Sequence, residues 1–219
     1  MARDWLLVET LGSEPAVVAQ GRRSENLVPL SEFLRRSPFL SAIQTAIAET
    51  VETGSSLTSI TPKGNLIRTE PVRMPDGTVH GVHVWFGSAK AEPPERPIPG
   101  PLVWDLTTGV AIDTPESLAN SGLDDEADTA EGRAFANDRP ARKLDASEKR
   151  DLPTVLHAGP GITLCDTWHT TNQEGEEFTV GFVVRTLLEP GTSDDDHLIA
   201  RAMNWRSDPV AVEAAQDEP

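Results

Sequence analysis

Two long apolar hairpins, one in each half of the chain, constrain the fold of this 219-residue protein more than any other feature. The first occupies residues 66–86 and turns at Pro75-Asp76-Gly77, and the second occupies residues 162–187 and turns near Asn172-Gln173-Glu174-Gly175. Apolar and β-branched runs on both sides of such a turn are typical of antiparallel strands. A shorter hairpin and a helical segment precede each long hairpin, so we predict two copies of one sheet-and-helix unit.

The first unit is predicted to begin with a short hairpin and to continue into helices. A capping hydroxyl followed by proline, as at Ser37-Pro38, favours a helix start, and a glycine such as Gly54 favours a helix end. The predicted elements before the long hairpin are strands at Trp5–Thr10 and Ala16–Ala19, a short helix within Leu27–Arg36, a longer helix from Ser37 to Gly54, and a strand at Leu57–Thr61.

A proline-rich segment separates the two units. Ala91 to Pro101 contains five prolines in eleven residues, so it is expected to be stiff, extended and unable to join the interior of a sheet. We therefore predict an N-terminal domain at residues 1–89, a linker at 90–100, a C-terminal domain at 101–190, and a C-terminal helix with an acidic tail at 191–219.

The second unit repeats the order of the first. Strands are predicted at Leu102–Leu106 and Val110–Ile112, and Asp113-Thr114-Pro115 offers a cap and a first-turn proline for a helix. Weaker helical character follows at residues 127–137 and 145–152, and a short strand is predicted at residues 154–156. The correspondence between the halves is one of element order and not of residue identity.

The segment after the second hairpin reads as a helix. Leu198, Ala202 and Trp205 fall on one helical stripe of His197–Trp205, which predicts an amphipathic helix. Such a helix would dock on the sheet or pair with a second protomer. The acidic residues before it, Asp194-Asp195-Asp196, would then favour the positive end of the helix and need not bind a metal.

Charge and composition exclude several classes of function. The net charge is −16, and residues 91–219 carry the whole excess, with 26 Asp and Glu against ten Lys and Arg. Such a surface repels phosphate backbones, so we expect no nucleic-acid partner. No apolar run reaches the ~20 residues of a membrane span, and the N-terminus lacks a secretory signal. A single cysteine excludes an intramolecular disulfide framework, and we expect a cytoplasmic protein.

Reactive or metal-binding side chains give no strong signature. Cys165, Thr167 and His169 share one face of a strand, but residues four apart on a strand lie ~13 Å from each other, too far for direct proton transfer. His80 and His83 point to opposite faces of a regular strand, so they cannot bind one metal unless a bulge intervenes. We predict no catalytic residue, no metal site and no cofactor.

The order of elements resembles that of PAS domains. The segment from Trp104 to Leu118 looks like the opening of a PAS domain, with a strand, a turn containing Gly109, a second strand and a capped helix. GAF domains use a related sheet with additional helices. The whole chain also resembles uncharacterised actinobacterial proteins built from PAS- and GAF-like domains.

This resemblance implies an α+β protein with two tandem PAS/GAF-like domains. Each would be a five-stranded antiparallel sheet with helices inserted after the second strand. Families of this kind bind small ligands or partner proteins and pass a signal onward. The chain lacks both the helical histidine of haem-binding PAS domains and the Asn-Cys-Arg-type motif of flavin photoreceptors, since Cys165 falls in a predicted strand.

A ligand pocket would lie between sheet and helices. Such sandwiches enclose a concave apolar space, and the predicted lining comes from aromatic residues and the cysteine of the second unit. Gly81 and Gly181, at matching places in the two hairpins, would admit a ligand, a helix or a neighbouring backbone. The candidate ligand-binding residues are Trp104, Phe135, Cys165, Phe178 and Phe182.

Two functions remain open at this stage. The first is a non-catalytic regulatory protein that senses a small apolar or mixed ligand, or that scaffolds protein partners or a homodimer through its sheet faces or its terminal helix. The second is an enzyme acting at the cleft between the domains. The enzyme would require His157 or His169 to lie close to Cys165 or Asp166.

Overall fold

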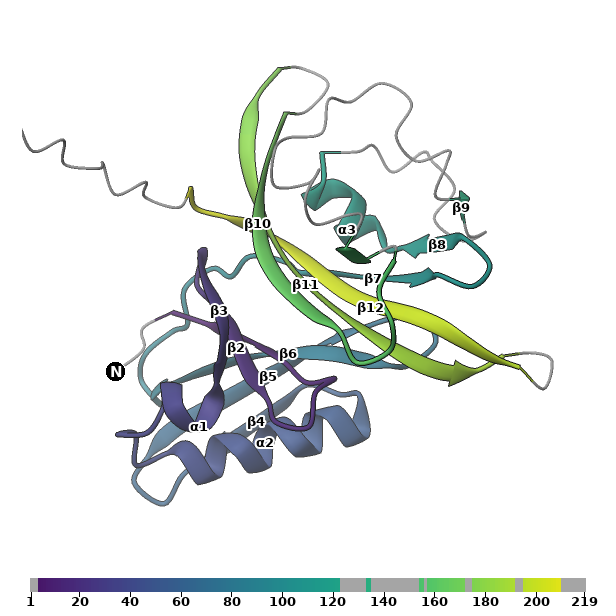
Figure 1. Cartoon of the computed structure of the whole chain (residues 1–219). Helices are drawn as coiled ribbons and strands as arrows, with labels where there is room; N and C mark the ends of the chain where they lie inside the picture. Colours follow the sequence, from purple (N-terminus) through teal and green to yellow (C-terminus); the bar gives the residue numbers. More distant parts are fainter. Residues whose placement is uncertain are drawn as a thin grey trace, which may run out of the picture.

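Two antiparallel sheets form the protein in a computed structural model that describes residues 4–122, 133–134, 154–155, 157–171, 175–191 and 195–209. The statements below concern these residues. The two sheets pack against each other face to face, and the helices lie on the outer sides (Figure 1).

The first sheet has the strand order β3-β2-β1-β6-β5-β4. Its last strand, β6, returns to pair with its first, β1, so that the two ends of the unit meet in the middle of the sheet. The bounds are β1 Leu6–Glu9, β2 Ala16–Gln20, β3 Arg23–Pro29, α1 Leu30–Phe33, α2 Leu40–Thr53, β4 Leu57–Ile60, β5 Asn65–Arg73 and β6 Val79–Ser88.

The second sheet has the strand order β10-β11-β12-β7-β8-β9, in which β9 is only two residues long. Read from the other edge, this is the same topology as in the first sheet, because β12 returns to pair with β7 as β6 pairs with β1. The bounds are β7 Gly100–Asp105, β8 Val110–Asp113, α3 Pro115–Asn120, β9 Arg133–Ala134, β10 Thr163–Thr171, β11 Glu177–Pro190 and β12 Asp196–Ser207.

Strand β1 shows how the layers are built from the sequence. Its four residues are all buried, although alternate side chains of a strand point to opposite faces. Leu6 and Val8 pack on Ile43 and Ile47 of α2, whereas Leu7 belongs to the core between the sheets. Because both faces of this sheet are covered, its central strands β1 and β6 are buried over nearly their whole length.

Most of the predicted elements are confirmed. Both long hairpins, both short opening hairpins and the helix ending at Gly54 are present, and Gly54 has the left-handed conformation (φ 62°) of a helix C-cap. Thr114 caps α3 by accepting a hydrogen bond from the backbone N–H of Ser117. Each sheet has six strands instead of the expected five. In the first sheet, β3 replaces the start of the helix predicted at residues 27–36. In the second sheet, β9 and β12 lie in stretches predicted as helical, whereas residues 154–155, predicted as part of a short strand, are helical.

The helix predicted at His197–Trp205 is wrong, because these residues lie in the twelve-residue strand β12. Both faces of β12 are covered. Met203 and Trp205 point into the core between the sheets, while Ala200 and Ala202 pack on the outer side of the second sheet. The resulting run without polar alternation resembled a helix, and the second domain therefore extends beyond residue 190 to Ser207.

This strand also changes how the two halves correspond. By position in the sheet, β5 and β6 of the first unit match β11 and β12 of the second. The second hairpin of the sequence, β10 and β11, therefore matches β4 and β5. The repeat itself is present in the topology, but the two long hairpins are not equivalent, and Gly81 and Gly181 do not occupy matching places.

Both glycines admit a neighbouring side chain. A Cβ at Gly81 would lie 2.8 Å from the sulfur of Met203, which reaches across from the second sheet. A Cβ at Gly181 would overlap the indole ring of Trp205, its neighbour on β12. The space left by each glycine is therefore filled by a side chain of the protein itself, Met203 at Gly81 and Trp205 at Gly181.

The substitution Gly181→Ala should lower the free energy of unfolding by about 1–3 kcal/mol, because the fully buried Trp205 ring has no room to retreat. Urea denaturation measures this change. Gly159→Ala is the matched control, since a Cβ there meets nothing within 4 Å, and it should be nearly neutral. Equal effects at the two glycines would contradict this packing.

Candidate functional site

The apolar core between the two sheets is a cluster of side chains to which both units contribute. It consists of Leu7, Val18, Ala19, Val72, Val183, Met203 and Trp205, and Leu27 and Cys165 pack at its border. We call this set the inter-sheet core. Its seven central residues are at most 5% exposed, so the helix-free faces of the two sheets are closed against each other.

A buried ion pair crosses from one sheet to the other beside the inter-sheet core. Arg185 of β11 donates from Nη2 to Oε2 of Glu9 in β1 at 3.2 Å, and from Nε to Oε1 at 3.3 Å. The same Oε1 accepts hydrogen bonds from the backbone N–H groups of Leu11 and Gly12. Glu9 is 1% exposed, and this full set of donors is what makes burial of its charge tolerable.

His80 makes a second polar contact between the two sheets, and a β-bulge turns its side chain toward the second sheet. The pairing of β5 with β6 shifts register after Val72, so His80 faces no residue of β5 and turns toward the second sheet. Its Nδ1 lies 2.8 Å from the carbonyl oxygen of Ala202, and its Nε2 lies 3.3 Å from Nη1 of Arg201. Since a carbonyl only accepts, Nδ1 carries the proton and Nε2 accepts from the guanidinium.

Arg201 in turn joins the units at the surface end of this network. It donates to both carboxylate oxygens of Glu189 at 2.5 and 2.8 Å, and to Asp76 in the turn between β5 and β6 at 3.0 Å. Burial alone would raise the pKa of Asp76, but hydrogen bonds from Thr78 and Arg201 hold it below its ordinary value. Two arginines thus face three carboxylates, which leaves no surplus positive charge for an anionic ligand.

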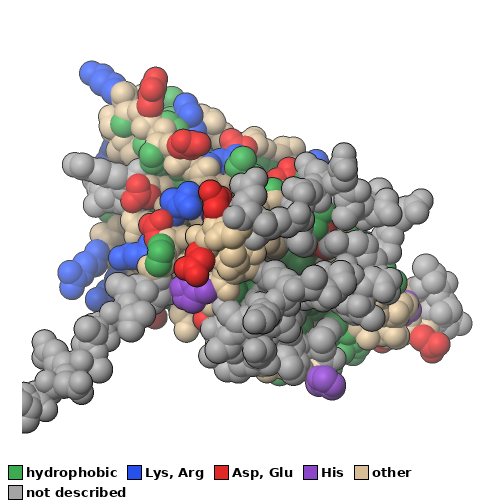
Figure 2. Space-filling model, turned by 90° about the horizontal axis from the view of Figure 1, so that it is seen from above, with side chains coloured by type: hydrophobic (Ala, Val, Ile, Leu, Met, Phe, Trp, Pro, Cys, Tyr) green, Lys and Arg blue, Asp and Glu red, His purple; other side chains and the backbone are tan. Residues whose placement is uncertain are grey.

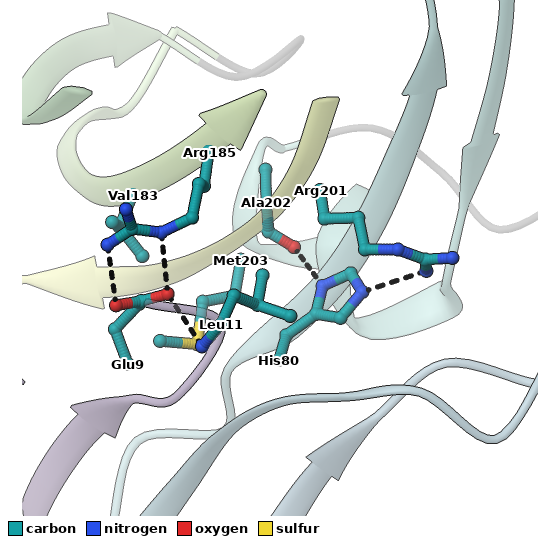
Figure 3. A pocket seen from close by; sticks show the side chains of 8 residues that line it. All are labelled: Glu9, Leu11, His80, Val183, Arg185, Arg201, Ala202 and Met203. Atoms are coloured by element: carbon teal, nitrogen blue, oxygen red, sulfur yellow. Dashed lines mark hydrogen bonds and ion pairs between the residues drawn. The ribbon is translucent and has the colours of Figure 1, made fainter. Parts of the chain in front are cut away.

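These side chains surround a small hollow, shown in Figure 3. Its empty volume is about 160 Å³, counting space open to solvent, whereas ligand sites usually measure ~300–1,000 Å³. Glu9 and Arg185 close one side of the view, and His80 with Arg201 closes the other. The hollow is lined by Glu9, Leu11, His80, Val183, Arg185, Arg201, Ala202 and Met203.

The other buried histidine, His83, holds the segment between the units. Arg96 approaches it with Nη1 at 3.1 Å from Nδ1 and lies over the ring of Trp5, 5.5 Å from the centroid. The indole N–H of Trp5 donates to the carbonyl of Pro94 at 2.9 Å. The proline-rich segment is therefore fastened along the first sheet.

His80 and His83 lie on the same face of β6, the face directed toward the second sheet, because the bulge at His80 interrupts the regular alternation of side chains. The opposite orientation expected for a regular strand is therefore wrong. The two histidines nevertheless have separate partners, Arg201 and Arg96. Among the described residues, no group of three or more His, Cys, Asp or Glu side chains could hold a metal ion.

Cys165 is at the border of the inter-sheet core and bonds to the backbone of the opposite sheet. Its thiol donates to the carbonyl oxygen of Glu25 at 3.6 Å, next to Leu27, whose φ of 48° is left-handed. Burial raises the pKa of Cys165 to about 12. The thiol is therefore protonated at neutral pH, which is the opposite of what a nucleophilic cysteine requires.

The predicted pocket residues do not line one space. Trp104 and Phe182 belong to the apolar cluster on the outer side of the second sheet, and Phe178 lies on that same face beneath the guanidinium of Arg206, 3.4 Å away. Cys165 is on the opposite face, next to the first sheet. Phe135 lies outside the described residues.

The acidic excess does not form a one-sign surface on the face drawn in Figure 2. Acidic and basic side chains are interspersed there among the described residues. In the part of the chain that the structure describes, no helix is long and apolar enough to cross a membrane.

Sequence reasoning missed the polar network because it depends on contacts between sheets. The one signal for Glu9 in the sequence was its place at the end of the apolar strand β1, where a glutamate that becomes buried needs a partner. A signal for His80 was the adjacent glycine, since His80-Gly81 forms the bulge.

Comparison with known proteins identifies relatives. The family described as Rv3651-like, N-terminal, matches residues 4–95, and the family described as Rv3651-like, middle domain, matches residues 98–207. An uncharacterised protein from Mycobacterium tuberculosis has a crystal structure with a TM-score of 0.89 and 59% identity, covering 98% of this chain. The chain spans 66% of the length of that protein.

Other solved structures are distant. A sensory box histidine kinase/response regulator from Burkholderia thailandensis is 11% identical with a TM-score of 0.34, over 49% of this chain and 76% of that one. The DhaR(N)-DhaL complex of E. coli is 11% identical with a TM-score of 0.29, over 94% and 80%. Likeness at these scores supports no argument about this chain. No curated protein matches it.

Acid should destabilise the protein through its buried histidines. Burial lowers the pKa of His80 to about 4 and that of His83 to about 3, from an ordinary value of 6.5. Below pH 6.5 the unfolded state therefore binds more protons than the folded state. The contribution of each histidine to the free energy of unfolding is fully present above pH 6.5, and it falls by up to about 1.4 kcal/mol per pH unit as the pH drops toward 4. Urea denaturation between pH 4 and 7 should show a shallower slope in His80→Gln, while the exposed His157→Gln keeps the wild-type slope.

Breaking the buried ion pair should be costly. Arg185→Met leaves the Glu9 carboxylate buried without its cation and should lower the free energy of unfolding by about 3 kcal/mol. Arg22→Met is the matched control, because the Arg22–Asp208 pair is exposed and should be worth less than about 1 kcal/mol. Chemical denaturation of both variants tests the difference. Similar losses would show that Glu9–Arg185 behaves as a surface pair.

Proposed function

We propose that this chain, which belongs to the Rv3651-like family, is a non-catalytic regulatory protein that scaffolds protein partners through two PAS/GAF-like units. The observation that carries this conclusion is the closure of the two helix-free sheet faces against each other. Among the described residues, what remains available to other molecules is the outside of a layered body.

The order of elements supports the PAS/GAF-like assignment. In each unit a short antiparallel hairpin leads into helical structure, and the final strand returns to pair with the first. The first unit follows the expected order from β1 to β6 with one additional strand, β3.

The histidines of β6 and β10 and the thiol of Cys165 have structural partners, which favours a non-catalytic protein. His80 and His83 are buried and bonded to Ala202 and Arg96, and the thiol of Cys165 is bonded to a backbone carbonyl. His169 lies 3.1 Å from the hydroxyl of Thr179. The inter-sheet core and the polar network lie between the units, which supports a non-catalytic protein over an enzyme acting at that place.

A second candidate is a small-ligand sensor, favoured by aromatic side chains on the outer face of the second sheet. The rings of Trp168 and Phe182 are 4.0 Å apart between centroids, and Trp104 packs in the same cluster. Phe178, under Arg206, extends this face toward its edge. A ligand that uses this region would be apolar or aromatic.

Native mass spectrometry of the purified chain, together with thermal shifts against a metabolite panel, distinguishes the two candidates. The scaffold predicts no retained small molecule and no shift. A retained molecule that is lost in Phe178→Ser, but not in the exposed control Ile60→Ser, would replace the scaffold by the sensor.

A further inference from the structure

The proline-rich segment between the two units, drawn as the coil from β6 to β7 in Figure 1, has the backbone of a polyproline II ligand. In residues 92–99 every residue except Glu95 is a proline or directly precedes one, and none lies in a helix or strand. Proline fixes φ at about −65°, and the residue before a proline is held extended. Such a run favours the polyproline II helix, which has three residues per turn.

The exposure of the side chains follows this period of three. The exposed ridge consists of residues spaced three apart, namely Glu92, Glu95 and Ile98. Ile98 is 63% exposed, which is unusual for a large apolar side chain. The positions one residue later turn toward the body, since Arg96 is half-buried and Pro99 is buried. One ridge of the segment thus packs on the protein while another faces solvent.

Both units hold the segment through its backbone. The indole N–H of Trp5 donates to the carbonyl of Pro94 at 2.9 Å, and the side-chain amide of Asn120 in α3 donates to the carbonyl of Ile98 at 2.9 Å. Arg96 anchors the middle, as described above. Because these contacts use the carbonyl groups of Pro94 and Ile98, both side chains remain exposed. A segment already fixed in this way loses little further conformational freedom when another protein binds it.

The exposed ridge carries uncompensated negative charge. Neither Glu92 nor Glu95 forms an ion pair with a described residue, and both flank the apolar surface of Pro94 and Ile98. Grooves that recognise polyproline II segments are lined by aromatic side chains, which pack on the rings. Basic side chains beside such a groove would complement the two carboxylates and orient the segment.

We propose that the exposed side of the proline-rich segment is a docking site for a partner protein with an aromatic groove flanked by Lys or Arg side chains. The groove takes Pro94 and Ile98, and its basic border faces Glu92 and Glu95. This proposal rests on the proposed scaffold function, for which it names the class of partner.

Photocrosslinking with the full chain tests the docking site. A benzophenone amino acid is placed at Ala91, the exposed start of the segment, and in a matched chain at Ile60 of β4, which is 67% exposed. Irradiation in a lysate of the native host should link a protein at Ala91 and not at Ile60. A synthetic peptide of residues 90–100 should compete with this capture. The same peptide with Glu92→Lys and Glu95→Lys should need at least about tenfold more, because like charges would then face each other.

Substitution in the full chain supplies the second readout. Pro94→Ala removes the ring but keeps the carbonyl that Trp5 bonds, so capture at Ala91 should fall severalfold while the melting temperature stays within a few degrees. Pro62→Ala, at an exposed proline between β4 and β5, is the matched control and should leave capture unchanged.

Only capture that the peptide prevents and charge reversal weakens supports the docking site. Absence of capture at Ala91, or capture that resists both the peptide and Pro94→Ala, overturns it. The scaffold function fails on a different result, a small molecule retained in native mass spectrometry, so the two failures are distinguishable.

Discussion

The packing of one sheet face on the other is the interaction on which the rest of this structure depends. It explains why β1 and most of β12 are buried on both sides, why Gly81 and Gly181 lack side chains, and why a glutamate and a histidine are fully buried. If either face were free, Leu7, Val183 and Trp205 would lie in water. The hydrophobic effect therefore favours a single layered body over two units on a flexible linker.

The polar network gives this packing its register. An apolar interface alone tolerates sliding, because the hydrophobic effect is not directional. The ion pair between Glu9 and Arg185, and the hydrogen bond from His80 to Ala202, are satisfied at one relative position of the sheets. Burying these groups costs free energy, and their full pairing offsets that cost only in the observed arrangement.

Local sequence patterns predicted what local physics determines. Hairpin turns, the glycine cap of α2 and the Thr114 cap of α3 follow from backbone preferences within a few residues. The strand β12 could not be found in this way, because helix-forming residues such as Ala200 and Met203 were placed in a strand by contacts on both of its faces. The predicted pocket failed for the same reason. Cys165 and Phe182 lie on opposite faces of the second sheet, and the sequence pattern did not specify the register that places them there.

Differential scanning calorimetry of the intact chain tests the account most directly. If the inter-sheet core and the polar network join the units, the protein unfolds in one transition whose calorimetric and van't Hoff enthalpies agree. Two separable transitions, or a calorimetric enthalpy well above the van't Hoff value, would show that the units unfold independently and would contradict the central role of the sheet-to-sheet interface.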